Sequence, residues 1–130
     1  MAQQKEFSEP AVAMQSAEKA FQAGDIAGSL ATYRRVMMVY PSSPESADAL
    51  FATGYLLAYF ANQQKDYHQA LAVFDEFAMK YPKHVKIAEA NNWRAILKAI
   101  IECRKENEHL TRSIEQLKKL DMKHEERRTR

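Results

Sequence analysis

The four histidines and the single cysteine are the residues best suited to bind a metal or to act as nucleophiles. The histidines are His68, His84, His109 and His124, and no two of them are four residues apart with a carboxylate between them. That spacing is what a helical zinc site needs. Cys103 and His109 are six residues apart, so on one helix they point to different faces. We therefore expect neither a metal site nor a Cys-His nucleophile pair.

Neighbouring carboxylates occur at Asp75-Glu76 and at Glu125-Glu126. Adjacent residues on a helix point about 100° apart, so neither pair has the geometry of a general acid and base. No glycine-rich loop that could hold a phosphate is present. The sequence therefore predicts a protein that is not an enzyme and that needs no cofactor.

The charge balance argues against binding to nucleic acid. Lys plus Arg is 19 and Asp plus Glu is 17, a net charge of +2. The three arginines at the C-terminal end are not interleaved with aromatic residues. No stretch of 18 apolar residues predicts a membrane span, and the first ten residues lack the pattern of a signal peptide. The compartment stays open: the periplasm or cell envelope if a signal has been removed, otherwise the cytoplasm.

The elements that position these side chains are predicted to be helices. The 130 residues include only 3 glycines and 4 prolines, too few for the turns of a sheet protein, and helix-favouring residues dominate. This length suits one domain with an appendage. We expect an all-α chain with helices near residues 10–23, 26–40, 44–63, 66–81 and 84–125, preceded by a flexible segment at 1–9.

A repeat of 41 residues relates segment 24–41 to segment 65–82. Each has a bulky residue, a small residue, a leucine, an aromatic residue and a final Tyr-Pro: Ile26, Ser29, Leu30, Tyr33 and Tyr40-Pro41 match Tyr67, Ala70, Leu71, Phe74 and Tyr81-Pro82. Small residues allow two helices to approach closely, and proline ends a helix. Asp25, Ser43 and Asp66 stand where N-caps are expected. The pattern predicts helical hairpins.

These residues resemble the tetratricopeptide repeat. Its second helix is matched by Tyr67-x-x-Ala70-Leu71-x-x-Phe74-x-x-Phe77-x-x-x-x-Pro82, and its first by Ala49-Leu50-x-x-Thr53-Gly54-x-x-Leu57. The closing Tyr-Pro and the residues after it are similar to the variant found in bacterial envelope proteins, such as outer-membrane assembly lipoproteins and Tol-Pal-associated periplasmic proteins. The segment from Gly54 to Tyr67 is four residues longer than the family spacing, which predicts one extra turn in that first helix.

The resemblance implies a solenoid of about two and a half repeats over residues 10–101, acting as a noncatalytic module that binds a protein or peptide partner in a bacterial envelope complex. It places the partner-binding residues in one groove: Asp48, Phe51, Tyr55, Tyr59, Glu89, Asn92 and Ile96. The alternative is that these rings are buried between helices or under the C-terminal helix. Both interpretations stay open at this stage.

The C-terminal extension, residues 102–130, continues a heptad seam that begins at Trp93. Apolar positions there alternate in steps of three and four, as in a coiled coil. The candidate oligomerisation residues are Asn107, Leu110, Ile114 and Leu117. In one interpretation the protein is an oligomerising scaffold that pairs through this helix. In a second interpretation the helix forms a coiled coil with a different protein, and in a third it caps the repeats.

Overall fold

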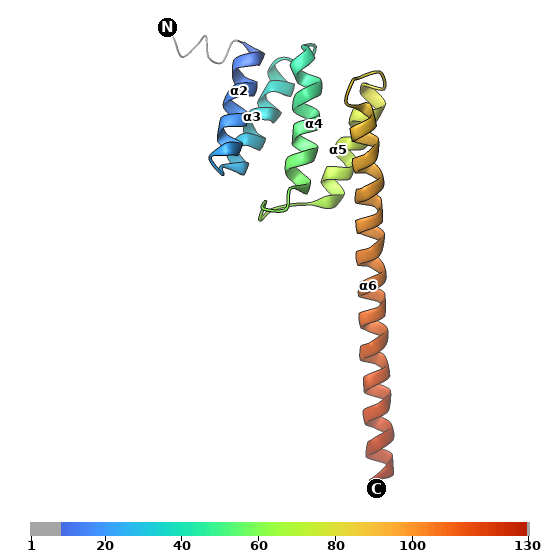
Figure 1. Cartoon of the computed structure of the whole chain (residues 1–130). Coiled ribbons are helices and arrows are strands. Elements are labelled where there is room, and N and C mark those ends of the chain that lie inside the picture. The colour runs from blue at the N-terminus through green and yellow to red at the C-terminus, as the bar shows by residue number, and fades with distance from the viewer. Residues whose placement is uncertain (1–8, 130) are drawn as a thin grey trace. The chain divides into compact units, whose positions relative to one another are not determined.

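The computed structural model describes residues 9–129, and within this range the chain forms five helices and no strand (Figure 1). The helices are α2 (Pro10–Gln22), α3 (Ile26–Val39), α4 (Pro44–Ala58), α5 (Tyr67–Lys80) and α6 (Ile87–Arg128). Sequential helices pack as hairpins, which confirms the predicted all-α fold ending in a long helix. The predicted flexible segment lies outside the described residues, apart from residue 9.

The chain divides into two compact units at a point inside α6. The first unit ends at Leu97, and the second runs from Lys98 to Arg130. The domain boundary that the sequence predicts at residues 101 and 102 stays a prediction. The first unit contains α2 to α5 and the start of α6, and it holds the hydrophobic core.

Aspartate side chains begin two of the helices as the sequence predicts. Asp25 accepts a hydrogen bond from the Gly28 N–H at 2.9 Å, and Asp66 accepts one from the Gln69 N–H at 3.0 Å. These bonds satisfy amides that have no partner within the first turn. Ser43 is the N-cap residue of α4 as predicted, but it makes no side-chain capping bond, because its hydroxyl donates to the Tyr40 carbonyl at 2.9 Å instead.

The first hairpin is held together at its small residues. Ser29 of α3 is fully buried, and its hydroxyl donates to the Ala17 carbonyl of α2 at 2.7 Å. A larger side chain would separate these helices. Tyr33 lies one turn further along α3, where burial, aided by the charge of Glu18, raises the pKa of its hydroxyl above the ordinary 10.0.

The second hairpin repeats this arrangement with alanine, glycine and phenylalanine. Ala70, Phe74 and Phe77 of α5 are all fully buried. Gly54 of α4 faces them: a Cβ atom built on it would lie only 2.8 Å from Cε2 of Phe74. The glycine of the repeat signature is therefore the point where the backbone of α4 approaches α5.

Ala70→Leu should overpack this hairpin and lower the free energy of unfolding by about 1–3 kcal/mol. Ala70 has no exposed surface, so a leucine there must displace its neighbours. Denaturant unfolding of the two proteins measures the effect. Ala72→Leu is the matched control, because Ala72 is exposed on the same helix. Equal stability of the Ala70→Leu variant and the original protein would contradict the repeat register.

The largest differences from the predicted helix boundaries concern α4 and α6. The extra turn expected in α4 is wrong: α4 ends at Ala58, not at residue 63, and residues 59–66 form a loop. The buried Asn62 side chain donates to the Leu56 carbonyl at 2.9 Å, and the Asp66 N–H donates to the Leu57 carbonyl at 2.9 Å. These bonds satisfy the last carbonyls of α4, so the helix stops there. Helix α6 begins at Ile87, three residues later than predicted.

Candidate functional site

Five aromatic rings of the first unit form a chain of contacts that we call the aromatic face: Phe21, Tyr55, Tyr59, Phe60 and Trp93. They come from the end of α2, the end of α4 with the residues that follow it, and the start of α6. The ring centroids of neighbouring members are 4.9 to 6.4 Å apart, mostly in edge-to-face contact. Such contacts hold the rings in place before any partner arrives.

The aromatic face is only partly covered. Phe60 is 79% exposed and Tyr55 is 37% exposed, while Phe21, Tyr59 and Trp93 are half-buried. Large rings that are exposed but fixed by their neighbours are typical of the anchors of protein interfaces. The structure thus brings together Tyr55 and Tyr59, two of the predicted binding residues, at 5.8 Å between centroids.

The predicted binding residues on α6 lie close to Trp93 in the sequence. Glu89 and Ile96 lie one turn before and one turn after it, and Asn92 is its neighbour in the sequence. All three side chains are exposed, with Ile96 at 40%. Helical spacing places Glu89 and Ile96 on the same side of α6 as Trp93, whereas Asn92 points about 100° away from it.

Phe51, another predicted binding residue, belongs to the core. It is 8% exposed, and its ring packs edge-to-face on Phe74 at 5.3 Å and on Phe77 at 5.6 Å. The Lys86 Nζ covers the ring at 5.1 Å from its centroid. We therefore leave Phe51 out of the candidate site.

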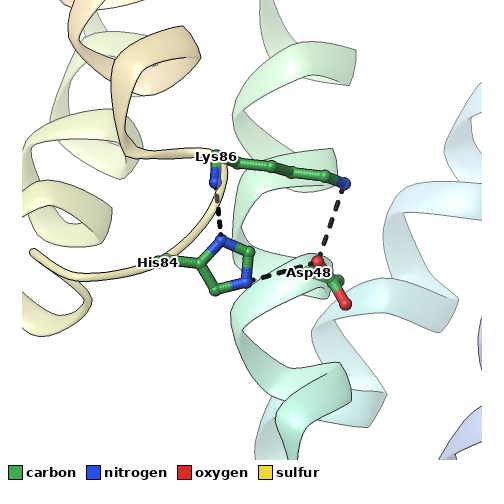
Figure 2. A network of polar contacts seen from close by, with 3 residues as sticks. All are labelled: Asp48, His84 and Lys86. Atoms are coloured by element: carbon green, nitrogen blue, oxygen red, sulfur yellow. Dashed lines mark hydrogen bonds and ion pairs between the residues drawn. The ribbon is translucent and has the colours of Figure 1, made fainter.

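Asp48 takes part in a polar network that joins α4 to the connection before α6 (Figure 2). Its Oδ1 is 3.6 Å from both Nε2 of His84 and Nζ of Lys86. The Lys86 N–H donates to Nδ1 of His84 at 3.0 Å, which leaves Nε2 as the nitrogen that carries the proton in the neutral ring. Because His84 also packs on Phe77 at 5.2 Å, the network fixes the start of α6.

Two hollows lie elsewhere in the first unit. One, of about 360 Å³, lies between α2 and α3 and is lined by Lys19, Arg35 and Val36 among others. The second, of about 470 Å³, is lined by residues of α3, α4 and α5, including Met37, Leu50 and Val73. Neither of these two hollows includes a residue of the aromatic face.

The candidate oligomerisation residues lie in the second unit, where Leu110 and Ile114 are each 52% exposed and Leu117 is 65% exposed. Asn107 is exposed as well, and its carbonyl accepts a hydrogen bond from the Thr111 hydroxyl at 2.8 Å. Their role in oligomerisation stays a prediction.

Within residues 9–129, no group of three His, Cys, Asp or Glu side chains is close enough together to hold a metal ion. Among the helices that the structure describes, none combines the length and the apolar character needed to cross a bilayer.

Phe21, Phe60 and Trp93 are members of the aromatic face that sequence reasoning missed. Trp93 stands four residues after Glu89 and three before Ile96, so helical spacing could have assigned it to the same face. Phe21 gave no such signal, because α2 carries no part of the repeat signature. Phe60 was missed because α4 was expected to continue to residue 63. In a helix that continued so far, the Phe60 side chain would point in another direction.

Comparison with known proteins gives a match over nearly the whole chain. A family model described as "YfiO: Outer membrane lipoprotein" matches residues 7–128. Searches of curated proteins and of solved structures give no significant match.

Proposed function

Because the chain belongs to the YfiO family of outer membrane lipoproteins, we propose that its first unit binds a segment of another envelope protein on the aromatic face. The protein would act in envelope assembly on the periplasmic side of the outer membrane. The family match supports the setting, and the tetratricopeptide-like hairpins support a binding role without catalysis.

The observation that carries this proposal is the row of partly exposed rings in mutual contact. Exposed aromatic rings normally lower the solubility of a monomer and do not add to its stability. At interfaces, such rings supply most of the binding energy. Glu89 and Asn92 are exposed polar side chains near Trp93 in the sequence. We expect the partner to present apolar side chains from a helix or an extended segment, because the rings offer a mainly apolar surface.

Site-specific crosslinking tests the proposal. A photoreactive residue in place of Phe60 should give a discrete crosslinked adduct in bacterial cells, because Phe60 is 79% exposed at the edge of the aromatic face. The same residue in place of Met79 is the control: Met79 is 83% exposed on α5 and lies outside the face. Equal adducts from both positions would argue against a specific site.

Tyr55→Ala and Tyr59→Ala should each weaken binding of the crosslinked partner by about 2 kcal/mol. Their helical content should stay nearly unchanged, since neither ring is in the buried core. Calorimetric titration with the purified partner measures binding, and circular dichroism measures folding. If both variants lose folding and binding in parallel, the rings serve the core and the proposal fails.

A further inference from the structure

The second unit presents an apolar stripe along α6. Leu110, Ile114 and Leu117 follow one another at steps of four and three, and they are 52%, 52% and 65% exposed. Leu120, at 63%, extends the stripe on one flank. Spacing of this kind places side chains along one seam of a helix, where a second helix can cover them.

The flanks of this seam carry an ordered set of charges. If Ile114 is a heptad a position and Leu117 the following d position, one flank, the e positions, contains Arg104, Thr111, Lys118 and Glu125. The other flank, the g positions, contains Glu106, Ser113, Leu120 and Arg127. Apart from Ser113, which is half-buried, these side chains are exposed. Charges at e and g decide partner choice and orientation in coiled coils.

In a parallel pair of α6 helices, these charges would not attract one another across the flanks. In that orientation each a residue faces its own copy, so Asp121 would meet the Asp121 of the second copy. Each g residue would lie beside the e residue of the next heptad, which places Glu106 beside Thr111 and Leu120 beside Glu125. No opposite charges meet across the flanks, and one layer contains two like charges.

An antiparallel pair places opposite charges on the flanks beside each other. In this orientation each a residue faces a d residue of the other copy. Each e residue lies beside an e residue of the other copy, and each g residue lies beside a g residue. With Ile114 of one copy against Leu117 of the other, Arg104 lies beside Glu125 and Glu106 lies beside Arg127. Twofold symmetry doubles each contact. Arg104 already has a contact within its own chain, and its five N–H donors allow it to bind a further carboxylate.

The charges also select the register of the antiparallel pair. A shift of one heptad in one direction places Arg104 beside Lys118, and a shift in the other direction places Lys118 beside its own copy. Both bring like charges together. From the apolar stripe and this charge complementarity we infer that α6 self-associates as an antiparallel helix pair centred between Glu115 and Gln116. This inference does not depend on the aromatic face.

Charge reversal tests the pairing in the full-length chain. Sedimentation equilibrium of the unmodified protein should show a monomer–dimer equilibrium. Arg104→Glu should weaken the dimer about tenfold, since two attractive contacts become repulsive. Glu125→Arg should do the same, and the double variant should restore association. Both side chains are exposed, so circular dichroism should give the same helical content for every variant.

Cys103 reports the orientation, because it is the only cysteine of the chain. In the antiparallel register the two copies of Cys103 are 25 residues apart along the axis, about 37 Å at 1.5 Å per residue. A mild oxidant should therefore not link the unmodified dimer. Arg128→Cys adds a thiol in the layer opposite Cys103, and this variant should form a disulfide-linked dimer.

Three results would overturn the inference. Disulfide linkage of the unmodified dimer would show a parallel pair. A double charge variant that stays as weak as the single variants would show that Arg104 and Glu125 do not meet. A monomer up to about 1 mM would show no pairing of practical strength. All these substitutions lie in residues 98–130, so binding of a partner to the aromatic face can be measured separately on the same variants.

Discussion

Replacing Phe74 with alanine is expected to lower the free energy of unfolding by about 3–5 kcal/mol, the largest effect of any single substitution that we predict. Phe74 is fully buried, and its ring is shared by three elements. It packs edge-to-face on Phe51 of α4 at 5.3 Å and stacks on Trp93 of α6 at 5.8 Å, with the two planes inclined by 5°. The alanine variant loses these contacts and leaves a cavity.

Denaturant unfolding measures this loss, with Phe60→Ala as the matched control. Both substitutions remove the same atoms, but Phe60 is 79% exposed, so its loss should change stability by about 0.5 kcal/mol or less. Equal effects of the two substitutions would contradict the assignment of Phe74 to the core. A Phe74→Ala variant that still folds should also bind a partner more weakly, because Trp93 of the aromatic face rests on the Phe74 ring.

The role of Phe74 was largely predictable from the sequence. It matches Tyr33 at a distance of 41 residues, next to a small residue and before a Tyr-Pro, and this periodicity indicates a buried helix face. The five helices and the two aspartate caps followed from equally local signals. Such features depend on residues close together in the chain, where spacing and capping chemistry are decisive.

Only two of the five rings of the aromatic face were predicted, because the face depends on two loops. The Tyr55–Tyr59 pair followed from helical spacing, but Phe60 owes its position to the end of α4 at Ala58. That end is fixed by Asn62, a polar residue whose bond to the Leu56 carbonyl has no signature in the sequence. Trp93 contacts Tyr55 from α6, which follows the connection where His84 and Lys86 contact Asp48 of α4. Contacts between distant residues decide both cases.

Phe51 was predicted to bind a partner but is buried, and contacts between distant residues again explain the difference. Helical spacing places it in line with Tyr55 and Tyr59, so the sequence alone predicts one helix face for all three rings and leaves open whether that face is exposed or buried. In the structure, Phe74 and Phe77 of α5 enclose it, and Lys86 covers what remains. Periodicity identifies a face of a helix, but it does not tell how far along that face the neighbouring helix extends.

Gly54→Leu is expected to cost about 3 kcal/mol, the second largest effect. The first carbon of any side chain at Gly54 would lie 2.8 Å from Cε2 and 2.9 Å from Cζ of Phe74, both closer than real Cβ contacts. The ring cannot yield easily, because Phe51 and Trp93 pack on it. The helices α4 and α5 must therefore separate, although leucine favours a helix more than glycine does.

A size exchange distinguishes this clash from a general intolerance of the site. Combining Gly54→Leu with Phe74→Ala places the new side chain next to the space that the ring has left. The double variant should therefore be more stable than the sum of the two single losses predicts, by roughly 1–3 kcal/mol of favourable coupling. Unfolding of all four proteins gives this coupling energy directly. Simple additivity would mean that Gly54 and Phe74 do not share one contact, and the register between α4 and α5 would then be wrong. A favourable coupling would show that Gly54 of α4 contacts Phe74 of α5. The repeat geometry depends on this contact.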